Sequence, residues 1–261
     1  MTARLAVVGA AAGLLSGLLG IGGGIVIVPG LIWAAGLDRH TASGTSLVAI
    51  LPIAVVAAVT YAVAPGGAFD AEASAIFVVG SVVGAVLGAR LNARVSERGL
   101  RLAMAVISGI FGLRLVIPLG FGVGKDELPL DAITVALLLY LGLQGGVLSG
   151  LLGVGGGAIA IAVLAVAGTS QVLAQGIALV ATIPTVITGA LTHRSQGTVA
   201  LRPGLTLGLI GMLLAIPGAL LAFALPVDLL RTVFGVFLLI GSVRMFRALR
   251  RAPLPDEPPP S

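Results

Sequence analysis

One glycine-rich phrase occurs twice in this chain, each time between apolar segments. Residues 16–28 read SGLLGIGGGIVIV, and residues 149–161 read SGLLGVGGGAIAI, 133 positions later. A second matching pair follows, since residues 42–52 read ASGTSLVAILP and residues 174–184 read AQGIALVATIP. Two copies of the same two phrases in the same order predict a duplicated structural unit.

The chain is more apolar than a water-soluble protein. Hydrophobic residues make up 58% of it and charged residues 10%. Apolar runs of about 20 residues recur along its length, and each is long enough to cross a hydrocarbon core of about 30 Å as a helix. We therefore predict an all-α, multi-pass protein of the cell (inner) membrane, with the lipid bilayer as a partner.

Charge and cysteine content argue against several other classes. The net charge of +5 comes from arginines clustered between apolar runs, and we interpret them as topology signals rather than as a nucleic-acid-binding face. The chain has no cysteine, which excludes thiolate metal sites, and we predict no metal and no cofactor. The apolar run after Arg4 begins the first copy of the repeat, so we expect it to be retained rather than cleaved as a signal peptide. The sequence does not indicate an oligomeric state.

Ten apolar segments are expected to form helices. The two that follow the glycine runs, residues 25–35 and 158–167, have only about 10 to 14 residues and rise about 15 to 21 Å, which predicts short arms beside about eight full spans. We assign residues 1–124 to the first transmembrane repeat, 125–249 to the second, and 250–261 to a disordered, proline-rich tail. The remaining segments are residues 5–19, 43–63, 73–91, 100–119, 132–152, 173–191, 203–225 and 229–246.

Arginine clusters predict the side of the membrane that each loop faces. Residues 90–101 and the C-terminal residues 244–251 each contain four arginines, so both should be cytoplasmic. Counting crossings back from these clusters puts the loops at residues 125–131 and 168–171 outside. The segment between those loops must then return to its starting side, as a hairpin bent at residues 153–157. The two halves are thereby inserted in opposite orientations, the inverted-repeat arrangement of many secondary transporters.

The doubled phrase also resembles a known family. S-G-L-L-G-x-G-G-G, followed in each copy by a helix with polar residues (SLVAILP at residues 46–52, ALVATIP at 178–184), is similar to the sulfite exporter TauE/SafE family of membrane permeases. The resemblance extends from about Val8 to Arg247. It implies export of a small sulfur-containing anion, such as sulfite or an organosulfonate. Because members of the family differ in substrate, it implies the class of cargo and not the cargo itself.

The glycine runs are the first candidate binding site. Without side chains, their backbone N–H groups can face a ligand, and the helix after each run presents its positive end. Two such ends near the midplane of the bilayer would bind an oxyanion without a charged side chain. The alternative is that these glycines only let helices pack closely. The candidate residues are Gly22, Gly23, Gly24, Gly155, Gly156 and Gly157.

A polar stripe on the helix after each run is the second candidate. Thr45 and Ser46 in the first copy, and Gln175 and Thr182 in the second, could line a path for the anion. The same side chains could instead bond their own helix or a neighbouring one. Both interpretations stay open at this stage.

Three basic residues near helix ends are candidate gates. Arg114 and Arg244 occupy equivalent places in the last helix of each half, and His193 ends the polar helix of the second copy. The alternatives are that the arginines extend to the lipid headgroups and that the histidine simply contacts water. We therefore treat gating as a hypothesis for all three.

The predicted function is export by alternating access, with two alternatives. Asp and Glu are absent from the interior of every predicted span, so the sequence supports no carboxylate proton relay and no sodium site. A proton- or cation-coupled importer would have the same fold and the opposite direction. A membrane-embedded enzyme would need a nucleophile with a base or a metal cluster, which the spans do not offer, and we predict no enzymatic activity.

Overall fold

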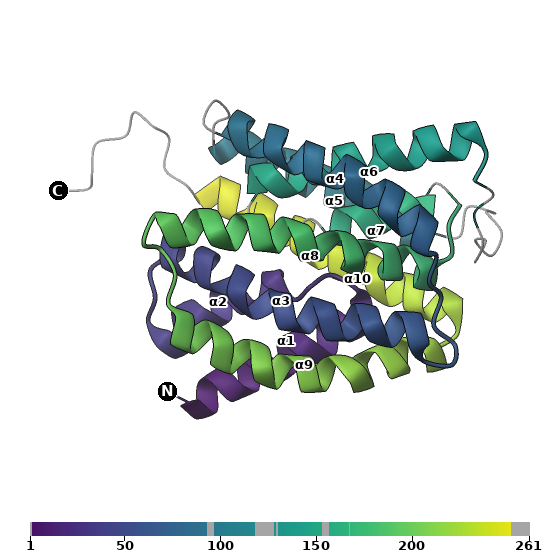
Figure 1. Ribbon diagram of the computed structural model, residues 1–261. Helices are drawn as coiled ribbons and strands as arrows, with labels where there is room; N and C mark the ends of the chain where they lie inside the picture. Colours follow the sequence, from purple (N-terminus) through teal and green to yellow (C-terminus); the bar gives the residue numbers. More distant parts are fainter. Residues whose placement is uncertain are drawn as a thin grey trace.

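The structure, a computed structural model, describes residues 2–92, 97–117, 128, 130–152, 157–166 and 168–251. Within these residues the regular secondary structure consists of ten α-helices, as the apolar segments predict (Figure 1). The helices are α1 (Thr2–Leu19), α2 (Gly24–Ala35), α3 (Arg39–Val63), α4 (Ala71–Asn92), α5 (Glu97–Val116), α6 (Ala132–Leu152), α7 (Gly157–Val166), α8 (Gln171–Ser195), α9 (Leu201–Ala224) and α10 (Val227–Arg251).

Five of the described helices are long and apolar enough to cross a membrane, judged by length and composition: α3, α4, α8, α9 and α10. Shorter apolar stretches lie in α1, α2, α5 and α6. The expected total of about eight full spans stays a prediction. The short segments after the glycine runs form α2, with 12 residues, and α7, with 10.

α1 and α2 form a hairpin because the chain between them turns through glycines. Gly20, Gly22 and Gly23 have φ of +70°, +72° and +75°, a left-handed conformation that residues with side chains rarely adopt. α2 then runs back along α1, so that the guanidinium of Arg4 lies 5.2 Å from the centre of the Trp33 ring. The start of α1 and the end of α2 therefore lie together. The second predicted bend, at residues 153–157, lies outside the described residues except for Gly157.

Small residues bring α1 and α9 into backbone contact. A Cβ on Gly9 would lie 2.6 Å from the carbonyl oxygen of Leu207, and one on Gly13 would overlap the backbone of Gly211. Residue numbers rise together along this contact, so the two helices run parallel. No side chain fits at either glycine without moving α9, which makes close packing the role of this stripe.

α6 and α4 repeat this arrangement at the opposite edge of the bundle. A Cβ on Gly142 would overlap the carbonyl oxygen of Phe77, and one on Gly146 would overlap that of Ser81. Gly142 and Gly146 stand 133 positions after Gly9 and Gly13, the same offset as the two glycine phrases. Figure 1 shows α4 and α6 at one edge of the bundle and α1 and α9 at the opposite edge, with α3 and α8 between them.

α3 and α8 pack antiparallel at the centre. A Cβ on Gly44, near the start of α3, would lie 2.9 Å from Cβ of His193, near the end of α8. In return, a Cβ on Gly176, near the start of α8, would lie 3.8 Å from the ring of Tyr61. Each glycine and each ring stands 132 positions from its counterpart. The start of each central helix therefore makes an equivalent contact with the end of the other.

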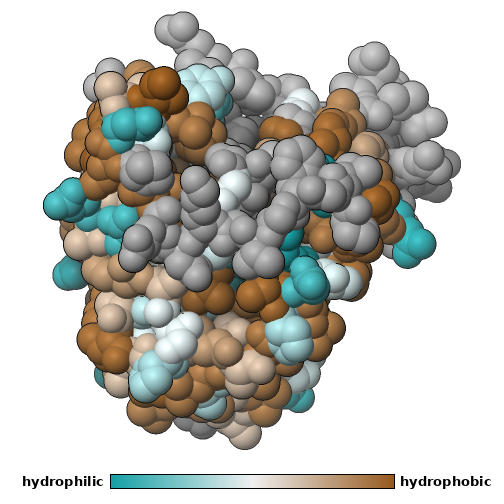
Figure 2. Space-filling model, turned by 90° about the vertical axis from the view of Figure 1, so that its right-hand side faces the viewer, coloured by the Kyte–Doolittle hydropathy of each residue, from teal (hydrophilic) through white to brown (hydrophobic). Residues whose placement is uncertain are grey.

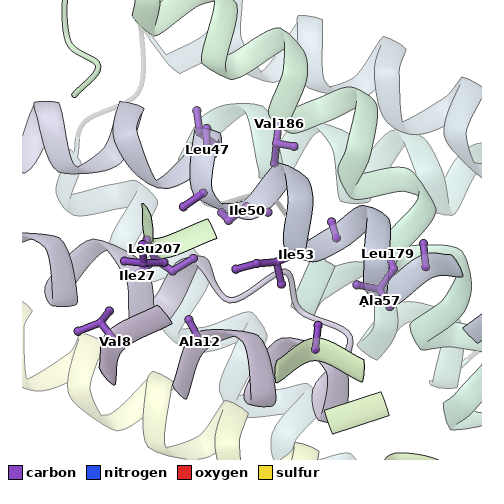
Figure 3. Packing of buried hydrophobic residues seen from close by; sticks show 14 of the residues in the cluster. Val8, Ala12, Ile27, Leu47, Ile50, Ile53, Ala57, Leu179, Val186 and Leu207 are labelled. Atoms are coloured by element: carbon purple, nitrogen blue, oxygen red, sulfur yellow. The ribbon is translucent and has the colours of Figure 1, made fainter. Parts of the chain in front are cut away.

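Two apolar clusters fill the interior, and apolar side chains also cover much of the exterior. The first cluster is formed mainly by α1, α2, α3 and α9, with Leu179 and Val186 of α8 (Figure 3). The second is formed mainly by α4, α6, α7, α8 and α10. Outside, large side chains such as Ile133 (78% exposed) and Val63 (75% exposed) face away from the core. Figure 2 shows brown, hydrophobic atoms over most of the described surface on that side. A water-soluble monomer rarely exposes so much apolar area, whereas lipid accommodates it.

Candidate functional site

The glycine break of the first half meets the start of α7 in the second half. A Cβ placed on Gly157, the first residue of α7, would lie 3.4 Å from the carbonyl oxygen of Gly20 and 3.4 Å from the carbonyl carbon of Ile21. It would also lie 3.3 Å from Oγ1 of Thr182 on α8. Gly157 is buried and has no room for a larger side chain unless these neighbours move.

Thr182 lies between the two glycine segments. Its Cγ2 is 3.3 Å from the position of a Cβ on Gly22, and its Oγ1 faces Gly157. The Thr182 side chain is 1% exposed, and its hydroxyl donates to the carbonyl of Ala178 at 2.8 Å, one turn earlier in α8. The structure thus brings together three of the residues selected from the sequence, namely Gly22, Gly157 and Thr182.

A small cavity, lined mostly by apolar groups, opens beside this meeting point. Its volume is about 10 Å³, room for about one water molecule. Three hydroxyl side chains face it, from Ser81 on α4 and from Thr182 and Thr185 on α8. No described residue that lines it is charged. The lining residues are Phe77, Ser81, Gly145, Gly146, Gly157, Ala160, Ala178, Ala181, Thr182 and Thr185.

The hydroxyls at the cavity donate to carbonyls of their own helices. Ser81 Oγ donates to Val78 O at 2.9 Å, and Thr185 Oγ1 donates to Thr182 O at 2.7 Å. Each hydroxyl oxygen keeps lone pairs, and each proton can turn toward a ligand by a rotation of the side chain. Ser81 is a site residue that the sequence analysis did not select. A serine in the middle of an apolar helix was its only signal.

Gln175 stabilises the end of α1. Its Nε2 donates to Leu18 O at 3.3 Å, and its Oε1 lies 2.8 Å from the hydroxyl of Tyr61. The Tyr61 hydroxyl is also 2.9 Å from Gly17 O, so its single proton is shared between two acceptors. The last carbonyls of a helix have no partner within the helix, and here α3 and α8 provide two of the missing donors. Gln175 is fully buried beside Gly20 and does not line the cavity.

The other polar residues selected on α3 lie apart from the cavity. Thr45 Oγ1 accepts a hydrogen bond from the backbone N–H of Ala200 at 2.9 Å and so holds the start of α9. Ser46 donates to Ser43 O at 2.7 Å within α3. Gly23 and Gly24 lie buried in the first bend and at the start of α2. Gly155 and Gly156 lie outside the described residues.

The candidate gating residues lie at three separate places. His193 is half-buried, with Nδ1 2.9 Å from Oγ1 of Thr198. Arg114 is half-buried in the last turn of α5, and Arg244 is exposed on α10. None of the three is among the residues that line the cavity.

Carboxylates near the described helix starts act as caps. The backbone N–H of Thr41 donates to Asp38 at 3.0 Å and that of Thr134 donates to Asp131 at 2.8 Å. Hydrogen bonds from the side chain, and then the backbone, of Thr41 and Thr134 hold the pKa of Asp38 and Asp131 respectively below its usual value. Over the described part of the chain, no group of three or more histidine or acidic side chains could hold a metal ion.

A comparison with known families identifies the family of this chain. The family model of the sulfite exporter TauE/SafE family matches residues 1–115 and 138–261, which include both glycine phrases and every residue that lines the cavity. No curated protein matches the chain. Because the family model covers nearly the whole sequence, the chain belongs to the sulfite exporter TauE/SafE family.

Proposed function

We propose that this chain exports a small sulfur-containing anion, such as sulfite or an organosulfonate, by alternating access around a site between its two glycine breaks. One observation carries the proposal: the first break, at Gly20 and Gly22, meets Thr182 and the start of α7 at Gly157 in the interior. The family is one of membrane transporters of sulfur anions, and several helices of the chain can span a membrane.

The contacts between the halves support an inverted repeat as the framework of this transporter. The contact between α1 and α9 has its counterpart in the contact between α6 and α4. In the centre, the start of α3 packs against the end of α8, and the start of α8 packs against the end of α3. Inverted halves of this kind place a site near the bilayer midplane and allow one half to move against the other. We take the repeat boundaries as residues 1–124 and 125–249 and place the C-terminus in the cytoplasm of a cell-membrane protein.

Backbone amides are suited to bind such an anion. The first amides of α2 and α7 have no partner within their helices, and each helix has its positive end at Gly24 and Gly157 respectively. Hydroxyls such as that of Thr182 add donors without adding charge. A site without a cationic side chain binds the anion weakly enough to release it. The cavity of about 10 Å³ is smaller than a sulfite ion, so binding requires the surrounding helices to separate.

The membrane potential can drive export without a coupling ion. A cell interior at about −100 mV favours outward movement of each negative charge by about 2.3 kcal/mol. This energetic argument favours a uniporter over a proton- or cation-coupled importer, for which the spans offer no acidic relay. In this scheme Arg114 and Arg244 attract the anion near the ends of the path, and His193 contributes to a gate.

Anion flux from liposomes tests the proposal. Purified protein is reconstituted, and efflux of sulfite, sulfate, sulfoacetate and chloride is compared with that from protein-free liposomes. Saturable efflux of sulfite or sulfoacetate that exceeds efflux of chloride is the expected result. If none of the sulfur anions moves faster than in protein-free liposomes, export of sulfur anions is the wrong function.

A further inference from the structure

The cavity has a counterpart between α3 and α9, where the equivalent side chains carry no hydroxyl. The offset of 132 positions between α3 and α8 pairs Thr182 with Ile50 and Thr185 with Ile53. Gly146 packs against Ser81 on α4, and its counterpart Gly13 packs against Gly211 on α9. Ser81 and Gly211 therefore occupy equivalent places. At each of these three positions, a hydroxyl beside the cavity corresponds to an alkyl group or a hydrogen at the equivalent place between α3 and α9.

Side chains fill the counterpart of the cavity. Ile53 is fully buried, and its Cδ1 lies 2.5 Å from where a Cβ on Gly211 would be, so it occupies the space that the glycine leaves. Ile27, Ile50 and Leu207 are also buried, and all four apolar side chains belong to one cluster. Figure 3 shows them in the interior of that cluster. The α3–α9 and α8–α4 boundaries thus have equivalent helices but different side chains between them.

The distance between the neighbouring helices differs as well. α3 approaches α9 closely at Gly204, Gly208 and Gly211, where a Cβ would lie 3.1, 2.8 and 2.5 Å from the nearest atom of α3. At the equivalent boundary between α8 and α4, Ser81 and Thr185 stand on either side of the cavity. The boundary between α3 and α9 is therefore closed, and the boundary between α8 and α4 is the one with space and hydroxyl groups.

We propose that the anion binds in the cavity between α4, α6, α7 and α8 and not at the equivalent place between α1, α2, α3 and α9, which Ile27, Ile50, Ile53 and Leu207 seal. This inference rests on the proposed function, which supplies the anion. An anion or water leaves bulk solvent only for a place that offers hydrogen bonds, and the isoleucine cluster offers none from its side chains. Thr182, Thr185 and Ser81 are then the residues that select the anion.

Reciprocal substitutions at one matched pair test the asymmetry. Thr185→Ile gives the second half the side chain of the first, and Ile53→Thr does the reverse. Sulfite and sulfoacetate efflux is measured from liposomes and normalised to folded, monodisperse protein. We expect Thr185→Ile to lower efflux at least about tenfold, and Ile53→Thr to leave it within about twofold of wild type. Equal losses in both variants, or a larger loss in Ile53→Thr, would overturn the proposal.

Thr182→Val covers the case in which Thr185→Ile does not fold. Valine keeps the shape of threonine and removes only the hydroxyl, so the cavity stays open. Efflux through Thr182→Val should fall about tenfold while its abundance stays near that of wild type. Wild-type efflux in this variant would remove Thr182 from the anion site and contradict the proposal.

Cysteine accessibility gives a second readout that does not depend on transport. The chain has no native cysteine, so Thr185→Cys and Ile53→Cys each carry one thiol. N-ethylmaleimide should label Thr185→Cys in the reconstituted protein, and Ile53→Cys should stay unlabelled until the protein is denatured. If liposomes that contain the wild-type protein move no sulfur anion but only Thr185→Cys is labelled, the proposed function is wrong and a cavity at Thr185 alone is supported. Equal labelling of both thiols rejects a cavity at Thr185 alone.

Discussion

The hydroxyl of Tyr61 on α3 lies 2.8 Å from Oε1 of Gln175 on α8, a contact between residues 114 positions apart. Both side chains are fully buried, and together they reach the last carbonyls of α1 just before the first glycine break. The ring of Phe223 packs edge-on against Tyr61, with 4.8 Å between ring centres. This pair therefore couples the helix that ends at the glycine bend to both central helices.

Tyr61→Phe should destabilise the protein by about 1–3 kcal/mol, because it leaves the oxygens of Gln175 and Gly17 buried without their donor. Thermal unfolding in detergent measures the effect. Tyr140→Phe is the matched control, since Tyr140 is 56% exposed and its loss of a hydroxyl should change stability little. Equal unfolding temperatures for Tyr61→Phe and wild type would mean that the pair does not stabilise the α1 end.

Gly157→Ala should impair transport more than folding. The new Cβ would stand 3.3 Å from Thr182 Oγ1 and 3.4 Å from Gly20 O, tight contacts that a small shift relieves, but it would cover the amides at the start of α7. We expect sulfite efflux to fall about tenfold at near-normal abundance. Gly241→Ala on α10 is the control, because a Cβ there meets nothing within 4 Å. A parallel loss of abundance and flux in Gly157→Ala would instead indicate a packing role.

Cysteine labelling on intact cells checks the inverted orientation of the halves. Leu130→Cys and Gly168→Cys lie in exposed positions before α6 and α8, and we expect both to react with an impermeant thiol reagent. Gln196→Cys, exposed after α8, should react only once the cells are opened. Reaction at one of the first two positions without the other is incompatible with a hairpin formed by α6 and α7.

The driving force can be tested with an imposed membrane potential. If a monoanion crosses alone, an inside-negative potassium diffusion potential should speed efflux and slow uptake, by up to about tenfold per 1.4 kcal/mol when the charge-moving step limits the rate. A pH gradient at zero potential should have little effect after correction for titration of the anion. Strict dependence on a proton or sodium gradient, without a response to potential, would favour the coupled importer.

The helices and the duplication were predictable from the sequence. Apolar runs, glycine runs and their spacing are local properties of the chain, and the helix order, the short α2 and α7 and the family followed from them. The arms are short because glycine bends such as Gly20–Gly23 interrupt the helices. This part of the structure needs no knowledge of which helix packs on which.

The partners of the polar side chains depended on the tertiary structure. Thr45, Gln175 and Thr182 all look equally suited to a polar path, but their partners differ. Thr45 holds the start of α9, Gln175 bonds the end of α1, and Thr182 faces Gly157. The direction of a side chain on a helix is set by how neighbouring helices pack against it, and the sequence does not state that rotation.

The difference between the halves was likewise decided by packing. The repeat pairs Ile53 with Thr185 in the sequence, but the pairing does not say whether either side chain meets open space. Ile53 fills the gap left by Gly211, whereas Thr185 and Ser81 leave a cavity of about 10 Å³. Filled and open volumes arise from side chains of several helices together. Composition and spacing therefore determined the repeated scaffold, and only the assembled bundle determined which of the two equivalent places keeps room for a ligand.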